Sequence, residues 1–277
     1  MVKIITDSST LYTVEEAKKL GFEAVPLCVS IGDFEGRDLQ IDMKDFYGRI
    51  EKGQIPKSSQ PPIGEVLDLY EAYKDDEIIN IAMADGLSGT YQSACGAREM
   101  VDNKEKITVF NSKTLCGPHR YMVEKAQKMK IAGHSVKEIL DWLEYVAERT
   151  ESFLIPQDFD FLRRGGRLTP MAATLGSVLK LKPIMTLTED CKKLDKYAIK
   201  RTMKSAVNTV IDHLKAKQLD ARHILYVSHA EALEEAKNIA AKLKEVFVDV
   251  EVQILDLGAA FVTQGGPKCV AIQYIEK

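Results

Sequence analysis

The sequence lacks the features that define several large protein classes. Its five histidines show no spacing typical of metal ligands, so we expect no metal site. No apolar run approaches the length needed to cross a bilayer, and the chain enters an apolar segment directly at Val2, so we expect neither a membrane span nor a signal peptide. The cysteines are odd in number, scattered and without a C-x-x-C pair, as is typical of reduced cysteines in a cytoplasmic protein. They are Cys28, Cys95, Cys116, Cys191 and Cys269.

The sequence also lacks a marked excess of basic or acidic residues. Basic residues number 38 and acidic residues 41, which leaves a net charge of −3. A chain without a basic surplus or a run of like charge gives no indication of nucleic-acid binding or of a solvating tail. Its 277 residues, 45% of them hydrophobic, are enough for two domains or one large α/β unit.

Predicted strands and helices alternate through the first half of the chain. This alternation favours an α/β fold with a largely parallel sheet and flanking helices, a Rossmann-like domain over residues 1–150. From about residue 151 the pattern changes, and we expect a second α/β domain with a mixed sheet over 151–277, with an approximate boundary and domains that can interleave. Thr13-Val14-Glu15-Glu16 and Ser135-Val136-Lys137-Glu138 predict capping boxes at two helix starts.

Several local expectations complete this outline. We expect one strand over 24–31, an irregular proline-rich segment over 56–62, and a turn from 258 through 267. Thr169-Pro170 predicts the start of a helix that carries Met171, Leu175, Val178 and Leu179 and ends at Lys182-Pro183-Ile184.

The stretch from Asp85 to Ala94 reads as a turn between a buried strand and a helix. Ser88 is placed to open that helix as its N-cap, and Gly89 removes a side chain that would keep a ligand away from the backbone. A helix start with free N–H groups and hydroxyls suits a carboxylate or a phosphate, although such residues often serve only as caps. The stretch is neither a P-loop nor a Gly-x-Ser-x-Gly elbow.

Two further turns of this kind follow predicted strands. The segments 7–10, 85–90 and 111–114 all leave the carboxyl ends of strands and all carry hydroxyl groups. In open α/β sheets ligands bind at that edge, so we expect the three turns to converge on one site. Farther on, Arg164-Gly165-Gly166-Arg167 combines a sharp turn with planar donors, which suits either an oxyanion or a solvated surface turn.

Taken together, these stretches resemble the DegV family over essentially the whole chain. The resemblance rests on motifs in a fixed order: Thr6-Asp7-Ser8, Ser58-Ser59-Gln60-Pro61, Leu87-Ser88-Gly89-Thr90-Tyr91-Gln92-Ser93-Ala94, Gly165-Gly166-Arg167, Lys182-Pro183-Ile184, Arg201 and a closing Gly-Pro turn.

The resemblance implies a two-domain α/β protein that buries one long-chain fatty acid and needs no cofactor. In the family the carboxylate lies near the Thr-Ser-Gln-Pro loop and the serine of Leu-Ser-Gly, and the acyl chain fills an apolar tunnel, to which the second domain would contribute. The best-understood bacterial members are fatty-acid-binding subunits of a fatty acid kinase. They present the carboxyl group to an ATP-using, dihydroxyacetone-kinase-like partner, and the acyl phosphate enters phospholipid synthesis. Transient contact with a membrane surface fits this role.

By correspondence, six residues would bind the fatty acid and two would face the phosphate or the kinase. The first set is Ser58, Ser88, Ser59, Gly89, Thr90 and Gln264, and the second is Arg167 and Arg201. The chain departs from the family pattern in five places, with Ser58 for threonine, Leu11 and Asn111 for aspartates, Gln264 for histidine and Lys268 for glycine. Glutamine donates a hydrogen bond but cannot titrate, so lipid binding is a safer expectation than acyl phosphate formation.

We therefore expect a carrier and not an enzyme, with no catalytic residues of its own. Two other functions stay open from the sequence. One is a hydrolase or transferase with Ser88 as nucleophile, for which no motif places an activating histidine. The other is a sensor or scaffold in which the lipid is structural and a protein partner receives the output.

Overall fold

The computed structural model describes residues 1–175 and 181–277. The chain forms two compact units, one of residues 1–148 with 258–260, the other of residues 149–257 with 261–277. No helix in the described ranges is long and apolar enough to cross a membrane. All five cysteines are free thiols.

The first unit is built on a parallel sheet of four strands in the order β2-β1-β6-β7. Its elements are β1 (Val2–Asp7), the short helix η1 (Ser8–Thr10), α1 (Val14–Leu20), β2 (Glu23–Val25), β3 (Cys28–Ile31), β4 (Phe34–Arg37), α2 (Met43–Glu51), β5 (Pro56–Ser59), α3 (Ile63–Ala72), β6 (Glu77–Ala82), α4 (Thr90–Glu99), η2 (Lys104–Lys106), β7 (Ile107–Asn111), α5 (Cys116–Ile131) and α6 (Val136–Ala147). The predicted α/β class and the parallel sheet are confirmed.

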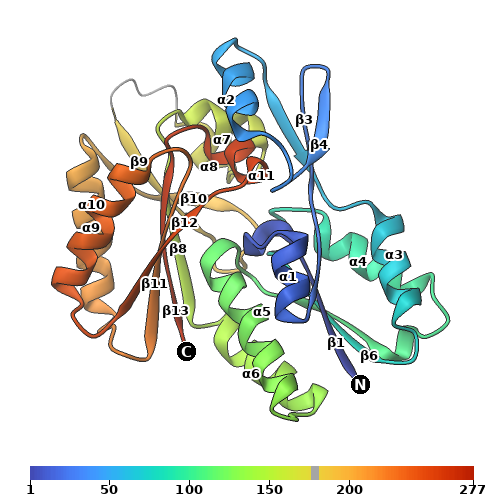
Figure 1. Cartoon of the computed structure of the whole chain (residues 1–277). Helices are drawn as coiled ribbons and strands as arrows, with labels where there is room; N and C mark the ends of the chain where they lie inside the picture. Colours follow the sequence, from blue (N-terminus) through green and yellow to red (C-terminus); the bar gives the residue numbers. More distant parts are fainter. Residues whose placement is uncertain (176–180) are drawn as a thin grey trace. The chain divides into compact units, whose positions relative to one another are not determined.

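Helices cover both faces of this sheet because β1 and β6 carry buried residues on both sides. Ile5 pairs with Asn80, and their face packs against α3 and α4, where Tyr70 accepts a hydrogen bond from Asn80. Thr6 pairs with Ile81 on the opposite face, beneath α5 (Figure 1). Successive strand residues point to opposite faces, so two central strands with buried residues on both sides require two helical layers.

The predicted strand over 24–31 is instead two strands in different sheets. β2 ends at Val25, before Pro26, which has no N–H for a ladder. β3 belongs to a separate antiparallel sheet of order β4-β3-β5. The expectation of an irregular segment over 56–62 is wrong in part, because 56–59 form the edge strand β5 of this sheet. Pro56 is its first residue, a position where a missing amide proton is tolerated.

Helix starts in the first unit follow the sequence with one exception. Thr13 and Ser135 each form the predicted capping box with the glutamate three residues on. Ser88 is not the N-cap that we expected: α4 begins at Thr90 and Gly89 is its cap. Ser88 lies one residue earlier, and its Oγ accepts a hydrogen bond from the Thr90 amide at 3.3 Å.

The second unit has a mixed sheet of six strands, as predicted, in the order β10-β9-β8-β13-β11-β12. Its elements are β8 (Thr150–Ile155), α7 (Phe159–Gly165), α8 (Pro170–Ala173), β9 (Lys182–Leu187), β10 (Leu194–Lys200), α9 (Met203–Ala216), β11 (His223–His229), α10 (Leu233–Val246), β12 (Glu251–Asp256) and β13 (Val270–Glu276). The helices α9 and α10 lie beside this sheet (Figure 1). Their apolar sides pack with β8, β11 and β13 in one core.

Two predictions for this half were wrong. The expected turn from 258 to 267 contains the helix α11 (Ala259–Gly265). The helix after Thr169 is only one turn long, since α8 ends at Ala173 before Leu175, and Lys182-Pro183-Ile184 begins strand β9. The expected helical positions Val178 and Leu179 lie outside the described residues.

Candidate functional site

The three hydroxyl turns converge at the carboxyl edge of the parallel sheet, as predicted. Asp7 Oδ2 accepts a hydrogen bond from the Met83 amide at 2.9 Å, and Asn111 Oδ1 accepts one from the Asp85 amide at 3.1 Å. The Ala84 amide donates to the carbonyl oxygen of Thr114 at 2.9 Å. These hydrogen bonds join the ends of β1, β6 and β7, so the Ser88 turn is anchored to all three strands.

Within this turn the hydroxyl of Ser88 is oriented by Thr90. The Ser88 Oγ lies 2.8 Å from the Thr90 Oγ1 and also accepts the Thr90 amide proton. When the Thr90 hydroxyl donates, both bonds point into the Ser88 oxygen, and the Ser88 proton can be donated to a ligand. Thr90 is buried and Ser88 half-buried, so only Ser88 presents its hydroxyl outward.

The Ser-Ser-Gln-Pro segment meets this turn through Gln60. A Cβ on Gly89 would lie 3.1 Å from Gln60 Oε1, so the glutamine side chain rests against the glycine backbone. The structure therefore brings two motifs together that are separated by almost thirty residues of chain. Gln60 is absent from the site residues expected above, although its place inside the motif was a signal that could have revealed it.

The small sheet presents Ser58 and Ser59 on opposite faces. Val29 pairs with Ser58 on one side and Gly36 on the other, whereas Cys28 pairs with Ser59 and Arg37. Directly opposed residues share a face and neighbours along a strand alternate. A ligand on one face of this sheet can therefore contact the side chain of only one of the two serines.

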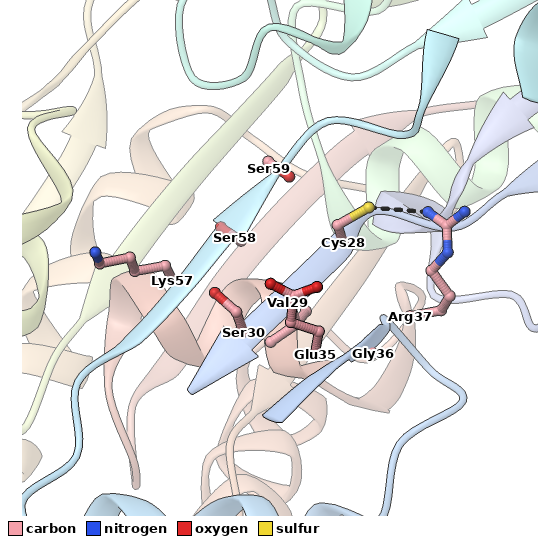
Figure 2. A pocket seen from close by; sticks show the side chains of 9 residues that line it. All are labelled: Cys28, Val29, Ser30, Glu35, Gly36, Arg37, Lys57, Ser58 and Ser59. Atoms are coloured by element: carbon pink, nitrogen blue, oxygen red, sulfur yellow. Dashed lines mark hydrogen bonds between the residues drawn. The ribbon is translucent and has the colours of Figure 1, made fainter. Parts of the chain in front are cut away.

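A pocket of about 660 Å³ lies against this sheet (Figure 2). Its lining comes from all three strands: Cys28, Val29, Ser30, Glu35, Gly36, Arg37, Lys57, Ser58 and Ser59. Arg37 donates to Cys28 Sγ at 2.9 Å and forms an ion pair with Glu65. Lys57 and Arg37 extend toward opposite ends of the pocket in Figure 2. By the register, Glu35, Arg37 and Lys57 bring charged side chains to the lining on the same sheet face as Ser59.

A much smaller void lies beneath the first turn of α4. Its volume is about 10 Å³, room for no more than one water molecule. Asp7, Thr90 and Ser93 contribute its polar lining, and Val25, Val66 and Ala94 part of its apolar lining. A void of this size holds no acyl chain.

A buried histidine lies near this edge but serves another serine. His119 Nδ1 is 2.7 Å from Ser9 Oγ, and its Nε2 is 3.0 Å from the Ile81 carbonyl oxygen. Burial lowers the pKa of His119, which keeps the ring neutral, and both partners are fully buried. In the described part of the chain no histidine hydrogen-bonds to Ser88, so Ser88 has no activating base from that source.

The three remaining predicted residues belong to the second unit, and two of them lie together. Gln264 stands in the last turn of α11 and packs on Gly165, which has no room for a Cβ there. Arg167 donates to the carbonyl oxygen of the same glycine at 2.5 Å. Gln264 Nε2 donates to Thr263 Oγ1 at 3.3 Å, while its Oε1 is buried without a hydrogen-bond partner. Arg201 is exposed between β10 and α9.

No group of three or more histidine, cysteine or acidic side chains within 1–175 and 181–277 is arranged to hold a metal ion. The described polar groups offer hydroxyls, amides and a few cations, which are the donors that a single anionic head group requires.

Fold and site together define a two-unit α/β protein with hydroxyl groups gathered at the carboxyl edge of its parallel sheet. A model described as an uncharacterised protein of the DegV family matches residues 1–277, and the chain belongs to that family. Protein DegV of Bacillus subtilis is 32% identical over 279 residues, which cover 98% of each chain.

Solved structures agree with this assignment. The crystal structure of DegV, a fatty acid binding protein from Bacillus subtilis, matches with a TM-score of 0.87 at 31% identity and covers 100% of this chain and 99% of that one. A DegV family protein from Ruminococcus gnavus, described with vaccenic acid, matches with a TM-score of 0.86 at 26% identity over 98% and 99% of the two chains. The predicted family and fold are confirmed.

Proposed function

We propose that this chain binds a long-chain fatty acid whose carboxylate contacts the hydroxyls of Ser58 and Ser88. The observation that carries the proposal is the meeting of the Ser-Ser-Gln-Pro segment with the Ser88 turn through Gln60 and Gly89. A carboxylate withdrawn from water needs several donors, and hydroxyls beside a helix start supply them without a buried cation. The fatty-acid-binding relative at 31% identity supports the ligand class.

The other predicted residues have distinct parts in this proposal. Gly89 lets the ligand approach the backbone, and Thr90 orients the Ser88 hydroxyl. The resemblance places Ser59 with the fatty acid as well, but Ser59 lies on the opposite face of β5 from Ser58, so its side chain does not contact the carboxylate in this proposal. Gln264 contributes a neutral amide from α11. The acyl chain is held in a tunnel to which the second unit contributes, where each buried methylene adds about 0.8 kcal/mol.

We further propose that the protein is a carrier and not an enzyme. It presents the carboxyl group to a dihydroxyacetone-kinase-like fatty acid kinase, with transient contact at a membrane surface, and the acyl phosphate serves phospholipid synthesis. Arg167 and Arg201 face the phosphate or the kinase. Alanine at either position is expected to spare fatty-acid affinity and to reduce kinase-dependent turnover, and a large loss of affinity would contradict this role.

The test of the ligand is native mass spectrometry of the purified protein, followed by titration with a long-chain fatty acid. We expect a bound mass of a fatty acid, and we expect Ser88→Ala to weaken binding by about 1–3 kcal/mol because a charged acceptor loses a donor. Full affinity in the Ser58→Ala, Ser88→Ala double variant would overturn the assignment. Binding without acyl phosphate formation, with any family kinase and ATP, would favour a lipid-bound sensor or scaffold.

A further inference from the structure

A carboxyl group that the sequence analysis did not single out lies fully buried directly after β4. Asp38 has no exposed surface. Its Oδ2 accepts a hydrogen bond from the Ser8 hydroxyl at 2.8 Å, and its Oδ1 accepts one from the Ala260 amide at 3.0 Å. Burial raises the pKa of Asp38. Burying a carboxyl group destabilises the folded state unless the group is hydrogen-bonded, so the hydrogen bonds that Asp38 accepts are needed to offset this cost.

Each oxygen of Asp38 has its own role. Ser8 also accepts a hydrogen bond from the Leu27 amide at 3.1 Å, so it ties Oδ2 to the segment between β2 and β3. Oδ1 reaches Ala260, which is 222 positions away in sequence. Residues 258–260 are the part of the C-terminal region that belongs to the first unit.

The approach of this returning segment depends on a glycine. A Cβ at Gly258 would lie 2.5 Å from Asp38 Oδ1 and 2.8 Å from Leu39 Cδ2. Any side chain at position 258 would therefore occupy the space of the carboxylate. Bare backbone at this position lets the Ala260 amide reach Oδ1.

This bond caps a helix from a distant part of the chain. Ala260 is the second residue of α11, and first-turn amides have no acceptor within their own helix. Side-chain oxygens from residues just before a helix normally satisfy them, whereas here Asp38 does so. The same helix carries Gln264 in its last turn.

We propose that Asp38 is a positioning residue: its bond to Ala260 caps α11, the helix that carries Gln264 in its last turn. The capping stands on the geometry of Asp38 and Ala260 alone, whereas the part that concerns Gln264 rests on the proposed fatty-acid function.

Hydrogen exchange in the ligand-free protein tests the capping. In Asp38→Ala we expect amides of residues 259–265 to exchange about tenfold faster than in the wild type, with β1 and β6 unchanged. Asp38→Asn keeps an acceptor at Oδ1 and is expected to stay within about twofold of the wild type. Unchanged exchange of α11 in Asp38→Ala would overturn the proposal.

A second pair of variants keeps the test decisive if Asp38→Ala does not fold. The methyl group added by Gly258→Ala would clash with Asp38 Oδ1, so this variant is expected to speed hydrogen exchange in α11. Gly48→Ala is its matched control, because no atom lies within 4 Å of a Cβ built there. Equal exchange of α11 in these two variants would also contradict the capping role.

A double-mutant cycle tests the effect on binding. If Asp38 acts through Gln264, Asp38→Ala weakens fatty-acid binding in the wild type by about tenfold but changes it less than about twofold in a Gln264→Ala background. Independent, additive losses would show that Asp38 does not act through Gln264. If the wild type binds no fatty acid, the proposed function fails, while the exchange experiment still decides the capping.

Discussion

Adjacent serines on β5 show how much one residue position decides. Ser58 shares its sheet face with Val29 and Gly36, and Ser59 shares the opposite face with Cys28 and Arg37. An acyl carboxylate is followed at once by methylenes, which need apolar surroundings. The face of Ser58 meets that requirement better than the face that carries an arginine.

We therefore expect Ser58→Ala and Ser59→Ala to differ. Ser58→Ala should weaken fatty-acid binding by about 1–3 kcal/mol, as the loss of a donor to a charged group does. Ser59→Ala should change it by less than about 0.5 kcal/mol, the usual range for a surface substitution. Calorimetric titration of both variants checks this, and equal losses would contradict the division between faces.

Gln264 sets a second expectation at this scale. A histidine can become cationic and stabilise charge on a carboxyl that is being phosphorylated, whereas a glutamine amide remains neutral. Gln264→His is expected to raise the rate of acyl phosphate formation with a family kinase severalfold and to leave fatty-acid affinity within about threefold. Rates measured beside titrations check both parts. A wild-type rate equal to that of a histidine-bearing relative would show that the glutamine is no handicap.

Secondary-structure elements divide into those determined locally and those determined by distant partners. The helices after Thr13 and Ser135 could be predicted because the cap and its glutamate are three residues apart. Strand β6 could be predicted from its apolar run. Strand β5 could not, because its proline and serines form a strand only where β3 offers a partner.

The candidate site divides in the same way. The meeting of the three turns at one sheet edge follows from chain order and could be predicted. The first turn of α11 could not, since it is capped by Asp38, which is remote in the chain. The opposite orientation of Ser58 and Ser59 likewise required knowledge that β5 is a strand.

The cap of α6 provides a test at the scale of an element. Ser135 Oγ accepts the Glu138 amide proton, and the Glu138 carboxylate accepts the Ser135 amide proton. Ser135→Ala is expected to lower the free energy of unfolding of the first unit by about 1 kcal/mol, because a first-turn amide loses its acceptor. Ser135→Asp, another good cap, is the control and should stay within about 0.5 kcal/mol. Chemical denaturation of the three proteins decides, and equal stability of the alanine and aspartate variants would contradict the cap's role.

For the whole molecule, the two units contain titrating groups that act in different pH ranges. In the first unit burial lowers the pKa of His119, against the opposing effects of Asp7 and the Ile81 carbonyl. In the second unit burial favours the neutral form of Glu151, but hydrogen bonds from Lys217 and His213 outweigh it and lower the pKa.

Both shifts make the folded state bind fewer protons than the unfolded chain. The free energy of unfolding therefore falls with decreasing pH, for His119 from about pH 6.5 downward and for Glu151 from about pH 4.3 downward. We expect the first unit to lose stability between pH 7 and 5 while the contribution of Glu151 is still intact.

The variant His119→Gln isolates this effect. Although its stability at pH 7.5 should be lower, the decline of its unfolding midpoint between pH 7 and 5 should be shallower than that of the wild type. Parallel slopes for wild type and His119→Gln would refute the assignment.

The brevity of β5 has a consequence for how this sequence can diverge. A four-residue strand tolerates exchanges that keep a hydroxyl, such as threonine at position 58. Loss of one residue between Pro56 and Ser59 would turn every later side chain of the strand to the other face. In an alignment of homologues, gaps are therefore expected on either side of this segment and not within it. The length of the segment is expected to vary less than the identities of its residues.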